Sequence, residues 1–188
     1  MPIHLYYGNG KGKTTAGLGL ALRALGQGQK VVLIQFMKKG DFGEIKALKK
    51  FPKVIVKQFG RKGFVKENNI IDKKLARSGL AFAKNILRKK IYPVKSPTQG
   101  RGVPPTAGQF DGVDILILDE LNTAVSFKLL SEREVLAFLR KIPKSTEVII
   151  TGRGENKKIK AQADLVTEMK EVKHYFKQGL KARKGIEF

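Results

Sequence analysis

The residues best suited to chemistry lie near the start of the chain, in the stretch YYGNGKGKTTAGLGLAL at positions 6–22. A phosphate-binding loop consists of a glycine, four residues of any type, and then glycine, lysine and serine or threonine. The second half of this pattern is present at positions 12–14, but Tyr7 stands where the first glycine belongs. The nearest glycine is Gly8, so the loop is one residue short. Either the motif is damaged, or the loop holds its nucleotide in another way.

A loop of this composition could bind the phosphates of a nucleotide. Glycines allow backbone N–H groups to converge on an anion without obstruction by Cβ atoms, and the start of the following helix adds a partial positive charge. Lys13 would bring a full charge to the phosphate oxygens, and the Thr14 hydroxyl could bind Mg²⁺. The loop follows a strand-like run and precedes a helical pattern, which is the context that favours phosphate binding. The alternative is a glycine-rich turn that holds no ligand.

A pair of acids, Asp119 and Glu120, follows the most apolar run of the chain, ILIL. In P-loop proteins an acidic residue at such a strand end binds Mg²⁺ directly or through water. Either acid alone could instead cap the following helix. Two consecutive acids in a chain that also has a phosphate loop favour the metal. Together, the loop and the acids predict binding of a nucleoside triphosphate with Mg²⁺.

Residues suited to acid–base or nucleophilic catalysis are scarce. The chain has no cysteine and two histidines, His4 at the start of the first strand-like run and His174 far downstream in EVKHYF. Neither histidine has a sequence context that marks it as a base. Because phosphoryl transfer to a substrate usually uses a positioned base, this scarcity suggests a reaction whose substrate brings its own nucleophile.

Strand-like runs alternate with helical patterns, which is typical of an α/β fold with a mainly parallel sheet between two layers of helices. The run at positions 115–118 is apolar on both faces, as a strand covered by helices on each side should be. Six strands are predicted: Ile3–Tyr7, Lys30–Phe36, Lys53–Phe59, Asp114–Glu120, Thr146–Gly152 and Asp164–Met169.

Three helices are predicted between these strands from apolar residues at helical spacing. The first covers positions 14–27, and a capping box of Ser131 and Glu134 opens the third. The predicted apolar faces are Leu18, Ala21, Leu22 and Leu25 in the first helix, Ile71, Leu75, Phe82 and Ile86 in the second, and Val135, Leu136 and Leu139 in the third.

One segment, at positions 92–112, has four prolines, four glycines and no periodicity. This composition predicts a long loop between a helix and the fourth strand. The loop could be an active-site lid or a neutral insertion, and we favour the insertion.

The charge balance is strongly basic: 38 Lys and Arg against 16 Asp and Glu give a formal net charge of +22. The electrostatic field of so large a positive charge attracts anions, including nucleotides, nucleic acids and anionic membranes. The basic residues are spread along the chain, however, without the interleaved aromatic residues that a base-stacking surface requires. Nucleic-acid binding is therefore disfavoured, and a lysine-rich solvated surface is the alternative.

The remaining composition is that of an ordinary globular chain. The 188 residues suffice for one domain with its own core. No apolar run is long enough to span a bilayer, and the first residues lead into a strand rather than a signal peptide. We therefore expect a cytoplasmic protein.

Four stretches, taken in order, resemble the ATP:corrinoid (cob(I)alamin) adenosyltransferases. They are GNGKGKTTAGLGLALRALGQGQKVVLIQF, ILILDELNTAV, EVIITGRG and ADLVTEMKEVKHYFKQGLKARKGIEF. The similarity covers nearly the whole chain, and the short loop together with this C-terminal stretch is far more specific than a P-loop alone. The resemblance implies a three-layer P-loop NTPase fold of RecA-like type, as a single domain over residues 1–188.

The resemblance also implies a reaction that suits a short loop. In this family ATP is held reversed, so that the ribose 5′ carbon rather than the terminal phosphate faces the second substrate. A corrinoid reduced to Co(I) attacks that carbon and expels inorganic triphosphate. Co(I) needs no deprotonation, which agrees with the scarcity of bases. A RecA-like ATPase that binds nucleic acid is the alternative function.

The family's site residues map onto this chain position by position. By this resemblance Lys13, Phe64 and Arg153 are the candidate catalytic residues, and Thr14, Glu120 and Asp119 are the candidate Mg²⁺ ligands. Arg153 could instead be a capping or surface arginine, and Phe64 a loop anchor. The triphosphate would be held by Gly8, Asn9, Gly10, Lys11, Gly12, Lys13, Thr14 and Thr15.

In the family, aromatic residues press on the lower face of the corrinoid and exclude an axial ligand of cobalt. Phe64, in the stretch FGRKGFVKENN, fits this role. The resemblance further implies a homodimer and a reductase or flavoprotein that supplies electrons. ATP, Mg²⁺ and a corrinoid are the expected small-molecule partners.

Overall fold

Six strands form one parallel sheet. The computed structural model describes residues 2–61, 63, 65, 67, 69–88 and 112–187. The strand order is β3-β2-β4-β5-β1-β6, and every neighbouring pair is parallel. All six predicted strands are confirmed to within one residue at each end. They are β1 (Ile3–Tyr7), β2 (Val31–Phe36), β3 (Val54–Phe59), β4 (Ile115–Asp119), β5 (Glu147–Gly152) and β6 (Leu165–Glu168).

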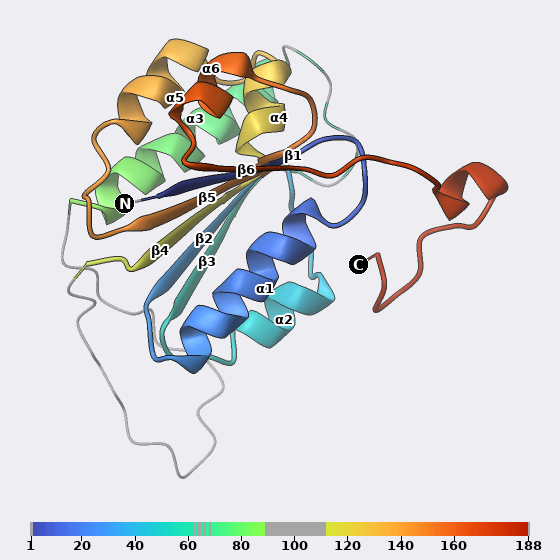
Figure 1. Ribbon diagram of the computed structural model, residues 1–188, viewed down its shortest axis with the longest axis horizontal. Coiled ribbons are helices and arrows are strands. Elements are labelled where there is room, and N and C mark those ends of the chain that lie inside the picture. Colours follow the sequence, from blue (N-terminus) through green and yellow to red (C-terminus); the bar gives the residue numbers. More distant parts are fainter. Residues whose placement is uncertain are drawn as a thin grey trace, which may run out of the picture.

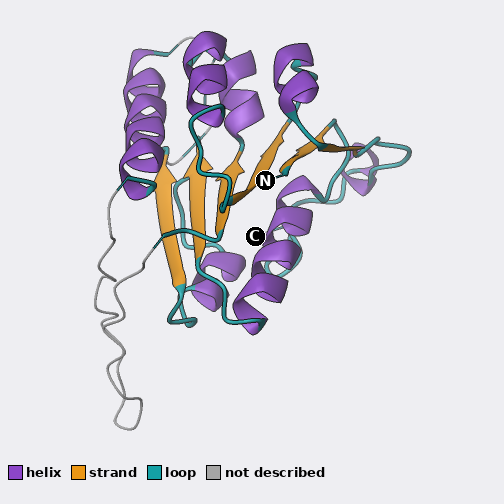
Figure 2. Ribbon diagram, turned by 60° about the vertical axis from the view of Figure 1, so that its left-hand side comes forward, coloured by secondary structure: helices purple, strands orange, loops and turns teal. Residues whose placement is uncertain are grey.

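Helices cover both faces of this sheet. As Figures 1 and 2 show, α1 and α2 lie on one face and α3, α4, α5 and α6 lie on the other. The predicted three-layer α/β fold with a parallel central sheet is therefore confirmed. The helices are α1 (Lys13–Gly26), α2 (Gly43–Leu48), α3 (Ile70–Ile86), α4 (Leu121–Ser126), α5 (Glu132–Leu139) and α6 (Lys157–Gln162), and a short 3₁₀ helix, η1, spans Tyr175–Gln178.

Alternate side chains of each central strand point into two separate cores, as the two-residue period of a strand requires. On β4, Leu116 and Leu118 pack toward α3, α4 and α5, whereas Ile115 and Ile117 pack toward α1 and α2. The same alternation holds along β2 and β5. The continuous apolar runs of the sequence thus reflect burial on both faces.

The predicted apolar face of α3 is wrong at its start. Ile71 is 60% exposed, and the face that packs on the sheet is formed by Ala76, Leu80, Ala83 and Ile86. Small residues on this face let the helix approach the strands closely, so the contact follows side-chain size rather than hydrophobicity alone. The capping prediction for α5 is confirmed, because Ser131 Oγ accepts the Glu134 N–H (3.2 Å).

Two features singled out in the sequence lie mainly outside the described residues. These are Phe64 and the segment at positions 92–112, of which the structure describes only Gly112. Within the described part of the chain, no helix combines the length and the apolar character needed to cross a bilayer.

The close approach of α3 to the sheet yields a stability prediction. A Cβ atom at Gly79 would lie 2.8 Å from a ring carbon of the buried Phe36 and 3.1 Å from the Phe59 ring. Overpacking of this kind costs about 1–3 kcal/mol, which exceeds the gain of about 1 kcal/mol in helix propensity. We expect Gly79→Ala to lower the free energy of unfolding in urea.

Gly19→Ala in α1 is the matched control for this substitution. A Cβ at Gly19 meets no atom within 4 Å, so Gly19→Ala should raise the free energy of unfolding by about 0.5–1 kcal/mol. Equal stabilisation by both substitutions would contradict the packing argument.

Candidate nucleotide-binding site

The short glycine loop connects the end of β1 to the start of α1. Gly8 and Gly12 have positive φ angles of 111° and 115°, and Gly12 is the N-cap of α1. The Gly10 N–H donates to Met169 O (2.7 Å) in the chain that follows β6. A Cβ at Gly8 or at Gly10 would lie 2.5 or 2.7 Å from that same carbonyl oxygen. These glycines are therefore required by the chain that crosses the loop, a constraint that the motif did not reveal.

Lys13, the lysine of the motif, is buried beneath this loop with 8% of its surface exposed. Its ammonium group donates to Gly10 O (2.6 Å). Burial lowers the pKa of Lys13, because loss of solvent disfavours the charged form. A bound phosphate would supply the negative charge that favours the protonated amine.

Asp119, at the end of β4, is fully buried and accepts four hydrogen bonds. The donors are the hydroxyls of Thr14 (2.8 Å) and Thr151 (2.6 Å), the amide of Gln35 (3.0 Å) and the ammonium of Lys38 (2.8 Å). Burial alone would raise the pKa of Asp119, but Lys38 and the hydroxyl donors outweigh it and hold the pKa below its usual value. The carboxylate is therefore ionised and oriented.

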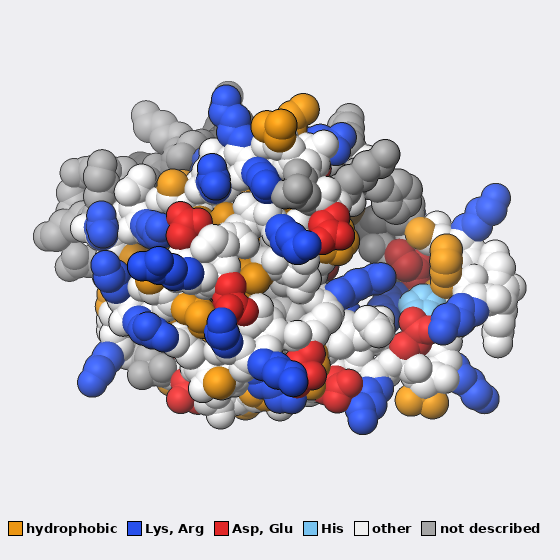
Figure 3. All heavy atoms as spheres, turned by 90° about the horizontal axis from the view of Figure 1, so that it is seen from above, with side chains coloured by type: hydrophobic (Ala, Val, Ile, Leu, Met, Phe, Trp, Pro, Cys, Tyr) orange, Lys and Arg blue, Asp and Glu red, His pale blue; other side chains and the backbone are white. Residues whose placement is uncertain are grey.

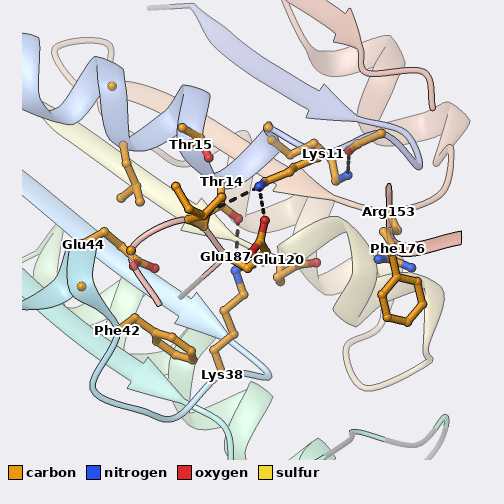
Figure 4. Close-up of a pocket in the computed structure, with 18 of the residues that line it drawn as sticks. Lys11, Thr14, Thr15, Lys38, Phe42, Glu44, Glu120, Arg153, Phe176 and Glu187 are labelled. Atoms are coloured by element: carbon orange, nitrogen blue, oxygen red, sulfur yellow. Dashed lines mark hydrogen bonds and ion pairs between the residues drawn. The ribbon is translucent and has the colours of Figure 1, made fainter. Parts of the chain in front are cut away.

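Lys38, like Gln35 and Thr151, is a residue of this cluster that sequence reasoning missed. Its ammonium lies 2.8 Å from Asp119 Oδ2, 3.1 Å from Thr14 Oγ1 and 3.7 Å from Glu120 Oε1. It therefore contacts all three predicted Mg²⁺ ligands, of which Figure 4 labels Thr14 and Glu120 beside it. Lys38 lies two residues beyond the end of β2, which is the direct neighbour of β4 in the sheet. Correct strand order, rather than any motif, was the information needed to find it.

Glu120 occupies the N-cap position of α4 with a left-handed backbone (φ 62°), but its side chain does not cap the helix backbone. Its carboxylate accepts a hydrogen bond from the Thr123 hydroxyl (2.5 Å). The Glu120 N–H donates to Thr151 Oγ1 (3.0 Å). The Glu120 side chain therefore does not cap α4, which was the alternative role considered for it.

Arg153 follows the end of β5 and is held by its backbone. Its N–H donates to Thr123 Oγ1 (2.7 Å), and its carbonyl accepts from Asn122 Nδ2 (2.9 Å). The side chain lies against the cavity beside the loop (Figure 4). The structure thus brings Arg153 to the same edge of the sheet as the loop and the acid pair.

The cavity at this edge has a volume of about 1080 Å³ and three kinds of wall. The loop, Lys38, Glu120 and Arg153 form a polar wall. Residues of the C-terminal segment, including His174 and Phe176, form a second wall. The third wall is apolar and comes from α1, α2 and their flanks: Leu18, Leu22, Phe42, Ala47, Leu48 and Phe51. Every residue predicted to hold the triphosphate, from Asn9 to Thr15, lines this cavity; Gly8 lies just before it in the loop.

The C-terminal segment is attached to the loop through Lys11. The Lys11 ammonium donates to Tyr175 Oη (2.6 Å) and to Glu187 Oε1 (2.8 Å). Tyr175 and Glu187 also contact each other, and Arg183 completes the cluster through Glu187. The Lys11 ammonium, followed by Tyr175 and Arg183, lowers the pKa of the Glu187 carboxyl. Lys11, predicted to bind phosphate, therefore already has an anionic partner.

Sequence comparison places this chain in a family. The model of the family described as "ATP:corrinoid adenosyltransferase BtuR/CobO/CobP" matches residues 2–188. The chain belongs to the ATP:corrinoid adenosyltransferase family. It is therefore an enzyme, a transferase, and the resemblance first noted in the short loop and the C-terminal stretch is confirmed.

Three relatives have similar lengths and sequences. "Corrinoid adenosyltransferase" of Pseudomonas aeruginosa is 35% identical over 185 residues, which cover 98% of this chain and 82% of the relative. "Corrinoid adenosyltransferase" of Escherichia coli K12 is 35% identical, with 99% and 85% covered. "Corrinoid adenosyltransferase CobA" of Salmonella typhimurium is 34% identical with the same coverage.

The nucleic-acid-binding ATPase is not favoured by these comparisons. The surface in Figure 3 agrees, because Lys and Arg side chains are scattered over that face with acidic residues between them.

The contacts of Lys38 predict a pH-dependent loss of stability. Lys38→Met removes the cation beside a buried carboxylate, which typically costs about 3–5 kcal/mol. The Asp119 pKa in the variant should rise, and protonation should then remove the uncompensated charge. We therefore expect a large loss of unfolding free energy at pH 7 and a smaller one near pH 4.

Lys39→Met, at the adjacent exposed lysine, is the control and should change stability by less than about 0.5 kcal/mol. Urea unfolding of both variants at the two pH values checks the prediction. A loss that is the same at both pH values would contradict it.

Proposed function

We propose that the enzyme transfers the 5′-deoxyadenosyl group of ATP to the cobalt of a corrinoid reduced to Co(I), and releases inorganic triphosphate. The electron pair of Co(I) forms the new bond to the 5′ carbon, while the bond from that carbon to oxygen breaks and its electrons leave with triphosphate. The observation that carries the proposal is the clustering of Lys13, Lys38 and Arg153 beside the loop. These cations suit a highly charged leaving group.

Several groups beside the loop that could act as a base are already engaged. Asp119 and Glu120 interact with Lys38 and with threonine hydroxyls, and Glu187 interacts with Lys11. His174 accepts the Phe176 N–H at Nδ1 (3.1 Å). A reaction in which Co(I) is the nucleophile needs none of them as a base, so these groups are available for charge compensation.

The roles of the loop residues follow from charge. Lys13 and the loop N–H groups would stabilise the negative charge that grows on triphosphate as the carbon–oxygen bond breaks. Arg153 would neutralise further phosphate oxygens or orient the corrinoid. Holding ATP with its ribose toward the open cavity would supply the remaining acceleration through orientation.

Mg²⁺ fits the oxygen atoms around Lys38. Thr14, Asp119 and Glu120 already surround an ammonium group there, and hydroxyl and carboxylate oxygens are suitable ligands of Mg²⁺. Bound at these residues, Mg²⁺ would neutralise charge on the triphosphate. Asp119, with all its hydrogen bonds formed inside the protein, would act by holding Thr14 in place. Lys38 would turn toward phosphate oxygens.

The remaining parts of the proposal rest on the family. Phe64 is proposed to press on the lower face of the corrinoid, and it lies outside the described residues. A reductase or flavoprotein is proposed to supply electrons, and the working form is proposed to be a homodimer.

Product analysis tests the reaction directly. The protein is incubated with ATP, Mg²⁺, a corrinoid and a strong chemical reductant. We expect a light-sensitive alkyl-cobalt spectrum and one equivalent of triphosphate for each cobalt alkylated. Formation of ADP and phosphate without dependence on the corrinoid would overturn the proposal.

Lys13→Ala should reduce turnover by about 10²-fold or more, because removal of one group that stabilises transition-state charge has effects of this size. Circular dichroism and thermal unfolding should show that the fold is retained. Lys39→Ala, which changes an exposed lysine outside the loop, is the matched control and should retain turnover. Unchanged turnover in Lys13→Ala would remove Lys13 from the site.

Glu187→Gln should tighten binding of ATP with Mg²⁺ several-fold in calorimetry, because phosphate must compete with the Glu187 carboxylate for Lys11. Glu132→Gln, which alters a similar Glu–Lys pair with Lys158 away from the cavity, should leave the affinity unchanged. Weaker binding by Glu187→Gln would show that the contact supports the nucleotide instead.

A further inference from the structure

The two acids at the end of β4 differ in how their carboxylate oxygens are used. Asp119 uses both of its oxygens in four hydrogen bonds inside the protein. In Glu120, Oε2 accepts from the Thr123 hydroxyl (2.5 Å), whereas Oε1 lies 3.7 Å from the Lys38 ammonium. One oxygen of Glu120 is thus held by the protein, and the other faces the cation of the cluster. Of this acid pair, Glu120 is therefore the better placed to contact a metal ion directly.

The Thr123 hydroxyl joins Glu120 to Arg153. It donates to Glu120 Oε2 and accepts the Arg153 N–H (2.7 Å). A hydroxyl has a single donor hydrogen, and here that hydrogen is used on the carboxylate. Thr123 is buried, with 5% of its surface exposed, whereas Glu120 and Arg153 both line the cavity (Figure 4). Thr123 therefore acts on the cavity through the two residues that it holds.

The chain that follows β5 lies close to α4 because residue 152 is a glycine. Gly152 has a φ angle of 150°, and a Cβ atom there would lie 2.6 Å from Thr123 N and 2.8 Å from its Oγ1. Beyond this contact, the Asn122 amide donates to the carbonyl oxygens of Arg153 (2.9 Å) and Gly154 (2.7 Å). Two consecutive residues of α4 thus hold the N–H and the C=O of Arg153.

The backbone of Glu120 is fixed as well. Its φ angle of 62° is uncommon for a residue other than glycine, and its N–H donates to Thr151 Oγ1 (3.0 Å). With its backbone held by Thr151 and its carboxylate by Thr123, the Glu120 side chain has already given up rotamer freedom that an unrestrained glutamate would lose on binding a ligand. A metal ion would therefore meet a carboxylate that is already oriented.

We propose that Thr123 positions the Glu120 carboxylate for Mg²⁺ and keeps it at a fixed position relative to Arg153, so that metal and arginine act on the same triphosphate. This inference rests on the Mg²⁺ site of the proposed function. Mg²⁺ demands near-ideal octahedral geometry, so a glutamate that can turn away binds it poorly. Removal of a group that orients a metal ligand typically costs about 10–100-fold in metal affinity or activity.

The contribution of the metal is measured by comparing ATP binding with and without Mg²⁺. Calorimetry in the absence of a corrinoid gives the dissociation constant of ATP in EDTA and in excess Mg²⁺, and the ratio of the two is the Mg²⁺ enhancement. Thr123→Val keeps the shape of the side chain and removes its hydroxyl. We expect this variant to lower the enhancement about tenfold or more, because Glu120 loses the donor that orients it. Thr123→Ser, which retains a hydroxyl, should restore most of the enhancement.

Thr146→Val is the matched control for this substitution. Thr146 is also buried, and its hydroxyl donates to Val113 O (2.7 Å). It stands just before β5, at the opposite end of that strand from Arg153. Loss of its hydroxyl should lower the stability of the protein and leave the Mg²⁺ enhancement unchanged. General damage to the fold weakens ATP binding with and without Mg²⁺ alike, so the ratio separates positioning of the metal ligand from a structural role.

A double-mutant comparison shows whether Thr123 acts through Glu120. In protein that already carries Glu120→Ala, Thr123→Val should cause little further loss of the Mg²⁺ enhancement, because the carboxylate that it orients is gone. An unchanged enhancement in Thr123→Val alone would overturn the proposal. A full further loss in the Glu120→Ala protein would also overturn it, since Thr123 would then act by another route.

These measurements also separate the role of Thr123 from the proposed function. A wild type whose ATP affinity does not respond to Mg²⁺ would overturn the metal site and the role of Thr123 together. A wild type that responds, with a Thr123→Val variant that responds equally, would overturn the role of Thr123 alone. Neither readout involves turnover, so adenosyl transfer itself is tested independently by the product analysis of the wild type.

Discussion

The buried carboxylate of Asp119 is the interaction on which the site depends. An ionised group without solvent costs several kcal/mol unless it is compensated, and here the compensation comes from Gln35, Thr151, Thr14 and Lys38. These residues belong to β2, β5, the first turn of α1 and the chain after β2. The hydrogen bond from Thr14 to the Asp119 carboxylate therefore holds the start of α1 against the middle of the sheet. The glycine loop, which leads into α1, is held with it. The same hydrogen bonds that stabilise the fold also orient the groups that we propose bind phosphate.

This arrangement explains why a lysine stands among oxygen atoms suited to a metal. The oxygens of Thr14, Asp119 and Glu120 create a site that favours a cation, and Lys38 supplies one from the protein itself. The oxygen atoms are therefore already held in position for the metal–nucleotide complex that the proposed function would bring to them. In the proposed function, the negative charge of the triphosphate would offer Lys38 a new partner, so displacement of its ammonium would not leave that charge uncompensated.

The sequence predicted the features that depend on local pattern, and missed those that depend on contacts between distant residues. The strands were predicted because a buried parallel strand is apolar over a continuous run, and the loop because its residues are adjacent in sequence. The helices α2, α4 and α6 have six residues each, too few for a helical period to show. Lys38 required the strand order. The strict need for glycine at Gly8 and Gly10 required knowledge that the chain near Met169 crosses the loop, about 160 residues later.

That crossing links the edge of the sheet to the nucleotide cavity. Met169 continues the pairing of β6 with β1 and at the same time accepts the Gly10 N–H. Beyond it, the C-terminal segment returns to the loop through the contact of Glu187 with Lys11 (Figure 1). The position of β6 therefore restricts the glycine loop, because Met169 O accepts the Gly10 N–H. It also restricts the C-terminal wall of the cavity, because that segment continues directly from β6. Both constraints pass through a strand whose own side chains are exposed, so the order of that strand bears directly on the position of the glycine loop.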